Sequence, residues 1–261
     1  MHRIIANALD DMRAAYDRRQ VWITLAKEDI GDQHRRTTLG PLWLLVNYFA
    51  FAATFIFVFT PEPSPTYAIY VATGLLVWNY LTDTITQAVA LFEREESFIK
   101  GTNLPLSAYI MRLTLQNLIR AVYAVVGCAV ILVLARVNVT ADWLWSGLGL
   151  LVILACSPAV TAVFGFLGIF FPDSQFIVSN LMRVAMFATP LFWTHGGEGG
   201  LRGALFYYNP FTYFLDIVRV PIVENTIPVA AFGISIAFTV VMWVLAIILL
   251  GTLRKQVALI V

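Results

Sequence analysis

Long apolar segments alternate with short polar connections along most of the 261 residues. Residues 41–60 contain no charged side chain. About 20 helical residues match the roughly 30 Å hydrocarbon core of a bilayer. Pro41 suits the first turn of a helix, where its missing N–H leaves no hydrogen bond unmade, and Gly40 before it permits a sharp turn. The pattern therefore predicts a first membrane span over residues 41–60.

Five more apolar segments predict further spans over residues 66–90, 108–134, 143–171, 176–193 and 227–250. The prolines within 61–65 and the stretch 172–175 predict tight turns between spans, and we expect Pro158 to break its helix. The fold class is thus an all-α membrane protein with six transmembrane helices in a domain over 41–250. A cytoplasmic tail is expected over 251–261.

Residues 1–40 form a separate, charged segment. Apolar residues such as Ile4, Leu9 and Met12 recur at helical spacing within 4–19, with charged residues mostly between them. This pattern predicts an amphipathic helix in the membrane interface, although a helix packed on the protein's own cytoplasmic side would show the same pattern. Residues 21–36 predict a second, less amphipathic interfacial helix.

The polar segment 194–226 interrupts the series of spans. It begins with a glycine-rich stretch around His195 and Glu198, which by themselves make a poor metal site. A short helix over 211–220 should end at Pro221, and Asp216 and Arg219 can pair on one face of it. Because non-helical backbone at membrane depth needs protein or water beside it, we expect a short re-entrant helical hairpin on the outer side.

Composition supports an integral membrane protein. The chain is 59% hydrophobic and 13% charged, with a mean hydropathy of +0.78, whereas a soluble domain of this length needs far more charge on its surface. Cys128 and Cys156 lie in apolar runs, which indicates buried thiols rather than a disulfide or a metal site. The first forty residues lack the short apolar core of a secretion signal.

The distribution of basic residues predicts the orientation. With six spans, twelve Lys and Arg residues fall on the side of the termini and three on the other, so both termini should be cytoplasmic. The twelve are Arg3, Arg13, Arg18, Arg19, Lys27, Arg35, Arg36, Arg94, Lys100, Arg112, Arg254 and Lys255, and the three are Arg136, Arg202 and Arg219.

Four motifs resemble, in order, the permease subunits of bacterial polysaccharide ABC exporters, which move O-antigen, capsule or teichoic-acid chains. The resemblance covers residues 20–260. The stretch Asp29-Ile30-Gly31-Asp32-Gln33-His34 departs from the basic and aromatic stretch usual in the family, so no phosphate-binding role is carried over to it. The motifs are Arg35-Arg36-Thr37-Thr38-Leu39-Gly40-Pro41-Leu42-Trp43, Gly74-Leu75-Leu76-Val77-Trp78-Asn79-Tyr80, Phe98-Ile99-Lys100-Gly101-Thr102-Asn103-Leu104-Pro105-Leu106-Ser107 and Asn209-Pro210-Phe211.

The resemblance implies a transport subunit of the bacterial inner membrane rather than an enzyme. No G-x-x-x-x-G-K-[ST] phosphate loop occurs in the chain, so this subunit should bind no cofactor and ATP and Mg²⁺ should be held by a separate partner. The implied assembly is a homodimer with two copies of an ABC ATPase, acting on a lipid-linked glycan within membrane lipid. Nothing in the sequence indicates a nucleic-acid partner.

The segment between the second and third spans is the expected ATPase dock. Phe98 and Ile99 would serve as apolar anchors in a cleft of the ATPase, within a short amphipathic helix and a charged rim. An ordinary solvated loop is the alternative. The charged residues of this segment are Glu93, Arg94, Glu95, Glu96 and Lys100.

Aromatic side chains are candidates for the substrate path, because sugar C–H groups stack on rings with weak directionality. In the alternative interpretation the rings face lipid or other helices, or form interface belts. The candidates are Tyr48, Phe51, Phe55 and Phe59 in the first span and Phe187, Phe192 and Trp193 near the end of the fifth.

Arginines near the inner interface are candidates for binding a lipid diphosphate, since guanidinium groups match phosphate oxygens. We assign Arg35, Arg36 and Arg112 to this role, with anchoring of the first two to anionic lipid as the alternative. An arginine within a span is costly unless paired, and Asp83 is a possible partner of Arg120.

Other transporter and enzyme classes remain as alternatives. An ABC exporter of a drug or another small amphiphile would share the fold. A secondary transporter should carry acids deep in several spans, and Asp83 is the one candidate. A membrane-embedded glycosyltransferase needs clustered acids, which occur only over residues 93–96.

Overall fold

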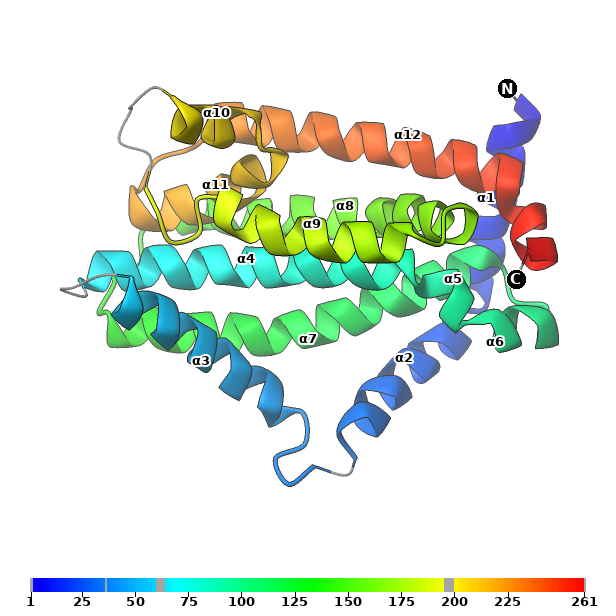
Figure 1. Cartoon of the computed structure of the whole chain (residues 1–261), viewed down its shortest axis with the longest axis horizontal. Coiled ribbons are helices and arrows are strands. Elements are labelled where there is room, and N and C mark those ends of the chain that lie inside the picture. Colours follow the sequence, from blue (N-terminus) through cyan, green and yellow to red (C-terminus); the bar gives the residue numbers. More distant parts are fainter. Residues whose placement is uncertain (1, 36, 60–63, 195–199, 261) are drawn as a thin grey trace.

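The computed structural model describes residues 2–35, 37–59, 64–194 and 200–260. These residues form twelve helices and no strand, which confirms the all-α prediction (Figure 1). The helices are α1 (His2–Asp17), α2 (Arg19–His34), α3 (Leu42–Val58), α4 (Pro65–Val89), α5 (Leu91–Arg94), α6 (Glu96–Gly101), α7 (Leu106–Leu134), α8 (Trp143–Phe170), α9 (Ser174–Ala188), α10 (Leu201–Tyr208), α11 (Pro210–Val223) and α12 (Val229–Ile260).

Four long helices, α4, α7, α8 and α12, run side by side through the molecule (Figure 1). Both chain termini lie at one end, together with α1, α5 and α6, and we name this the terminal end. Helices α10 and α11 lie at the opposite end, which we name the hairpin end. Helix α3 leans across α4 and α7, while α11 packs against α4, α8 and α12.

Among the described residues, three helices are long and apolar enough to cross a membrane: α7, α8 and the Val229–Val257 part of α12. Helix α3 is equally apolar in character but shorter, at 17 residues. With an all-helical fold and these helices, the chain is a membrane protein.

Most predicted segments coincide with helices to within two residues, but two do not. Helix α9 ends at Ala188, five residues before the predicted end, and α12 continues to Ile260 through the predicted tail. The extension of α12 is held by packing, because Gly251 lies against the carbonyl of Ile4 and any side chain there would overlap it. The predicted 61–63 turn lies outside the described residues.

The predicted break at Pro158 is wrong, because α8 is continuous through this residue. Pro158 has no N–H to offer the carbonyl of Leu154, four residues earlier. The Ser157 hydroxyl donates to that carbonyl at 2.9 Å and accepts a hydrogen bond from Tyr80 on α4 at 2.8 Å. A neighbouring hydroxyl thus replaces the missing donor.

The predicted end of the helix at Pro221 is also wrong, since α11 extends to Val223. Pro221 leaves the carbonyl of Ile217 without its helical donor. That carbonyl lies against Gly149 of α8, where an added Cβ would overlap it. Close packing of the two helices therefore carries α11 through the proline.

The interior contains three groups of buried apolar side chains. One joins α4, α8, α9, α11 and α12, the second lies at the terminal end around α1, α5, α7 and α12, and the third joins α3, α4 and α7. Cys128 and Cys156 are buried and free, as predicted.

Candidate functional site

An ion-pair cluster at the terminal end joins three parts of the chain, and we name its members Asp29, Glu95 and Arg112 the junction. Nε and one terminal nitrogen of Arg112 on α7 donate to the two carboxylate oxygens of Asp29 on α2, at 2.7 and 2.8 Å. The other terminal nitrogen donates to Glu95, between α5 and α6, at 2.7 Å. Gln116 also donates to Asp29. Arg112 therefore fixes α2 and the α5–α6 turn to one core helix.

The burial of this cluster makes it energetically important. The side chains of Arg112 and Glu95 are 9% and 7% exposed, and that of Asp29 is 26% exposed. A buried arginine is tolerated when its donors meet carboxylates, and removal of one partner then strands a buried charge. Loss of any member of the junction should therefore destabilise the fold, because it leaves a buried charge without its partner.

The α4–α5 turn is held rigidly on α8. The rings of Phe92 and Phe166 meet edge to face at 5.4 Å, and both are fully buried. Gly165 and Gly168 of α8 allow this approach, since Cβ atoms there would meet Phe92 and the carbonyl of Val89 respectively. Helix α5 is therefore packed directly against α8.

The structure divides the predicted docking residues into two sets. Glu95 is buried in the junction and is not part of a charged rim, and Ile99 is half-buried against the terminal-end core rather than an outward anchor. Phe98 is 43% exposed, and its ring lies 5.4 Å from the Arg112 guanidinium. The exposed set consists of Glu93, Arg94, Glu96, Phe98 and Lys100.

All four charged members of this exposed set have partners within the chain, and Arg94 lies 3.7 Å from Glu95. Lys100 and Glu96 form an ion pair at 2.6 Å across one helical turn. Glu93 accepts a hydrogen bond from Gln175 of α9. The predicted short helix is confirmed as α6. The exposed side chains of this segment include the four charges above and the aromatic ring of Phe98.

The predicted lipid-diphosphate role of Arg112 does not fit its contacts, because carboxylates occupy both edges of its guanidinium group. Arg35 is exposed and lies 3.6 Å from Asp32. Arg36 lies outside the described residues. Sequence reasoning missed Asp29, although an arginine within an apolar span signals a need for nearby carboxylates.

A second anchor at the terminal end binds α1. The backbone N–H and hydroxyl of Ser107 donate to one Asp11 oxygen, at 2.9 and 2.6 Å. Arg254 of α12 donates to the carbonyl of Asn7 at 2.6 Å. Helix α1 thus packs on the protein's own helices α7 and α12, the alternative that the sequence left open.

A pocket of about 330 Å³ opens between α3, α4 and α7, and we name it the polar pocket. Asp83 and Arg120 both line it, but the described contacts of Arg120 go elsewhere: to Gln87 at 2.8 Å, Asn117 at 2.9 Å and Gln33 at 3.1 Å. Among the described residues, no hydrogen bond or ion pair therefore joins Asp83 to Arg120, but the two opposite charges interact through space within the pocket. The lining residues are Leu44, Asn47, Tyr48, Phe51, Leu75, Trp78, Asn79, Tyr80, Thr82, Asp83, Asn117, Arg120, Ala121, Ala124 and Met186.

Helix α2 connects the junction to this pocket. Asp29 and Gln33 lie four residues apart on α2, and they contact Arg112 and Arg120, which lie two helical turns apart on α7. The same two helices therefore carry both contacts.

Most of the predicted path aromatics gather into one cluster. Phe192 stacks on Phe55 at 4.9 Å and lies 4.8 Å from Phe59 and 5.8 Å from Phe187. Phe51 stacks on Phe55 at 6.5 Å and is 54% exposed. Residues far apart in sequence thus form one aromatic surface between α3 and the segment after α9.

The other two predicted aromatics have local roles. Tyr48 is buried, and its hydroxyl donates to the carbonyl of Ala72 at 2.7 Å. Gly127 permits this packing, because a side chain there would overlap the Tyr48 ring. The Trp193 indole N–H donates to the carbonyl of Phe187 at 3.1 Å.

The predicted Asp216–Arg219 pair is confirmed, at 2.7 Å. Arg219 is 3% exposed, donates to the carbonyl of Pro190 at 2.6 Å, and lies 3.9 Å above the Tyr70 ring. Asn209 caps α11 by accepting from the N–H of Phe211 at 3.0 Å.

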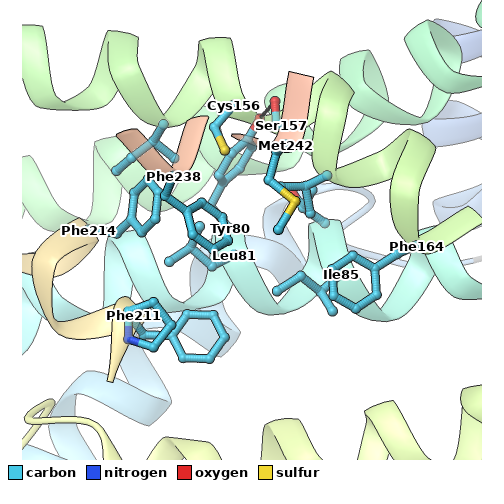
Figure 2. Close-up of a pocket in the computed structure, with 14 residues that line it drawn as sticks. Tyr80, Leu81, Ile85, Cys156, Ser157, Phe164, Phe211, Phe214, Phe238 and Met242 are labelled. Carbon is cyan, nitrogen blue, oxygen red and sulfur yellow. Dashed lines mark hydrogen bonds between the residues drawn. The ribbon is translucent and has the colours of Figure 1, made fainter. Parts of the chain in front are cut away.

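An apolar pocket of about 270 Å³ lies on the other side of α4, between α8, α11 and α12 (Figure 2). Phe211, Phe214, Phe238 and Met242 face it, together with the thiol of Cys156. Tyr80 lines both this pocket and the polar pocket. The described residues contain no group of three potential metal ligands, and His195 and Glu198 lie outside them.

Comparisons of this chain with a family model and with individual proteins agree on one family of transporters. Residues 19–223 match the family model of the ABC-2 type transporter. An O-antigen export system permease protein RfbA of Klebsiella pneumoniae is 22% identical over 193 residues, which are 72% of this chain and 74% of the relative. An RfbA permease of Myxococcus xanthus is 21% identical over 227 residues, 83% of this chain and 85% of the relative. The matched region contains the junction, the polar pocket and the aromatic cluster, and the chain belongs to the ABC-2 type transporter family.

Proposed function

We propose that this chain is the transmembrane subunit of an ATP-driven exporter that moves a lipid-linked polysaccharide, such as O-antigen, across the inner membrane. The family match over residues 19–223 carries the proposal, and the names of the relatives from two organisms support the substrate class.

The energy comes from a separate subunit in this proposal. The chain has no phosphate loop, so a partner ATPase binds ATP and Mg²⁺. Its contact on this chain is the exposed set around Phe98 on α6. Force applied there reaches α7 through Glu95 and Arg112, and reaches α8 through the buried Phe92.

The membrane arrangement in this proposal has six spans, α3, α4, α7, α8, α9 and α12, with α10 and α11 as an outer hairpin. The common position of the termini is compatible with an even number of crossings (Figure 1). At about 1.5 Å per residue, the 15 residues of α9 reach only about 22 Å, so the non-helical residues after it complete that crossing. Both termini are then cytoplasmic.

The substrate path follows the aromatic cluster of α3 and the segment after α9. Rings such as Phe51 and Phe59 present weakly directional surfaces to a sliding glycan. Both are about half exposed in the single chain, so a second copy in a homodimer would complete the path. Arg35 and Arg36, at the turn before α3, remain the candidates for contact with the lipid diphosphate.

A second candidate function is export of a small amphiphile. The apolar pocket beside Phe211 and Phe238 supports it, because aromatic and aliphatic linings of this kind suit drug-like ligands (Figure 2). A strain that lacks the protein separates the two: glycan retained in the cytoplasm supports the first function, and sensitivity to an amphiphile with normal surface glycan supports the second.

Reconstitution tests the energetic part of the proposal. Vesicles that contain the permease and its ATPase subunit should hydrolyse ATP and move lipid-linked glycan, whereas vesicles with either subunit alone should not. Transport by the permease alone, or labelling of a cysteine at position 98 from the outer side, would contradict the proposal.

A further inference from the structure

We propose that the polar pocket is a binding site for uncharged sugar units of the exported glycan, with Asn117, Thr82 and Asp83 as hydrogen-bonding residues. The proposal deepens the proposed function, on which its choice of ligand rests. The polar pocket has a volume of about 330 Å³, which lies at the lower end of the roughly 300–1,000 Å³ usual for small-molecule sites.

The pocket brings together the two kinds of group that bind sugars. The amide groups of Asn47 and Asn79 and the carboxylate of Asp83 can exchange hydrogen bonds with sugar hydroxyls. The rings of Phe51 and Trp78 can stack on sugar C–H faces. The apolar pocket on the other side of α4 is lined by the hydroxyl residues Tyr80, Thr84 and Ser157 but by no amide or carboxylate, so these two groups belong to one face of the helix.

Two buried polar atoms in the pocket have no hydrogen-bond partner among the described residues. They are Nδ2 of Asn117, whose residue is 1% exposed, and Oγ1 of Thr82. The Asn117 amide is oriented by Arg120, which donates to its Oδ1 at 2.9 Å and so leaves the N–H₂ group free. An unsatisfied buried donor costs about 1–3 kcal/mol, and a ligand hydroxyl that accepts from Asn117 would remove that cost.

The charges of the pocket favour a neutral ligand over a phosphate. Asp83 and Arg120 carry opposite charges within the same lining, and Arg120 is held by the side-chain oxygens of Gln87, Asn117 and Gln33. A diphosphate needs uncompensated positive charge and free guanidinium donors. The carboxylate of Asp83 opposes an anion but accepts hydrogen bonds from sugar hydroxyls.

Cysteine protection tests the proposal on the full chain in lipid nanodiscs, without an ATPase. The reporter is Leu44→Cys in a Cys128→Ser, Cys156→Ser background, treated with a charged, membrane-impermeant thiol reagent, since Leu44 lines the polar pocket and is partly exposed. The matched control is Leu81→Cys on α4, a partly exposed leucine that lines the apolar pocket. The probes are maltotriose, chitotriose and mannotriose, with farnesyl diphosphate as the anionic alternative.

We expect Leu44→Cys to react and Leu81→Cys to react far more slowly. At least one trisaccharide should slow the Leu44→Cys reaction on the order of tenfold when present at about ten times its Kd, which for such ligands is near millimolar. Farnesyl diphosphate should not protect. Adding Asn117→Leu should leave the labelling and remove the protection.

The proposal is overturned if Leu44→Cys is unreactive, if no trisaccharide protects, if farnesyl diphosphate protects equally, or if protection survives Asn117→Leu. Because the assay contains no ATPase, its result is separate from the test of transport. Sugar protection without ATP-driven transport would retain this site while contradicting the proposed function.

Discussion

Two buried arginines at opposite ends of the molecule are held in different ways. Arg219, at the hairpin end, pairs with Asp216 on its own helix and with the carbonyl of Pro190, and lies over the Tyr70 ring. Arg112, at the terminal end, pairs with Asp29 and Glu95, which lie 83 and 17 residues away in sequence.

The two arginines differ in where their counter-charges lie, and this difference affects how each end of the molecule responds to movement of its helices. Arg219 has its counter-charge three residues away, so it braces the hairpin end. Arg112 has its counter-charges on two other elements, so a shift of α2 or α6 changes its environment directly. On this comparison we expect the terminal end to transmit movement and the hairpin end to resist it.

Arg112→Ala should have the largest effect. It strands two carboxylates, and loss of one partner of a buried pair costs about 3–5 kcal/mol. The expected result is a fall in melting temperature on the order of 10 °C in nanodiscs, with loss of ATP-driven transport. Arg112→Lys keeps the charge but loses the two-edged geometry, so it should recover part of the stability. An unchanged melting temperature for Arg112→Ala would show that the junction does not join these elements.

Arg219→Ala should cost less, about 3 kcal/mol, because it strands one carboxylate and a ring contact. The double variant Arg219→Ala, Asp216→Ala should recover part of the loss, since no unpaired charge remains. Thermal unfolding measures both. If the comparison holds, the ATPase activity per folded complex stays near that of the unchanged protein, and a specific loss of coupling would remove the distinction between the two ends.

Gly168→Ala should cost about 2 kcal/mol, as overpacking a tight contact typically costs 1–3 kcal/mol. The new Cβ would overlap the carbonyl of Val89 and displace the α4–α5 turn from α8. Gly147→Ala in the same helix is the matched control, because nothing lies within 4 Å of a Cβ there. Equal melting temperatures for the two variants would contradict the rigid contact.

Phe98→Ala should have the smallest effect on stability, below about 1 kcal/mol, since it removes one partly exposed cation–π contact. The expected change is functional: weaker co-purification of the ATPase subunit and lower transport. Phe171→Ala, at an exposed aromatic position of the same end, is the control. Normal ATPase association of Phe98→Ala would place the dock elsewhere.

The apolar pattern predicted the helices well because burial in lipid constrains every residue of a long span. Predicted ends near residues 134 and 170 agree with α7 and α8 to within one residue. The pattern failed at Pro158 and Pro221. At Pro158 the hydroxyl of Ser157, on the same helix and hydrogen-bonded to Tyr80 of α4, donates to the freed carbonyl of Leu154. At Pro221 the freed carbonyl of Ile217 packs closely against Gly149 of α8.

The candidate site was predictable in outline only. The segment around Phe98 could be identified as a surface helix, but its register could not, so Glu95 and Ile99 were placed outward. Six-residue α6 has too few turns for periodicity to fix its buried face. The pairing of Arg112 with Asp29 could not be predicted from the sequence, because the two residues meet only when α2 folds back onto α7.

By itself, the sequence determined that this protein is helical and membrane-embedded, because composition and span length follow from the cost of placing polar groups in lipid. It also determined the local Asp216–Arg219 pair, since i, i+3 neighbours share a helix face. Only the tertiary structure decided which charges meet across helices, which face of α4 is polar and which buried polar atoms lack a hydrogen-bond partner. These depend on helix rotation and packing, which one-dimensional periodicity leaves open.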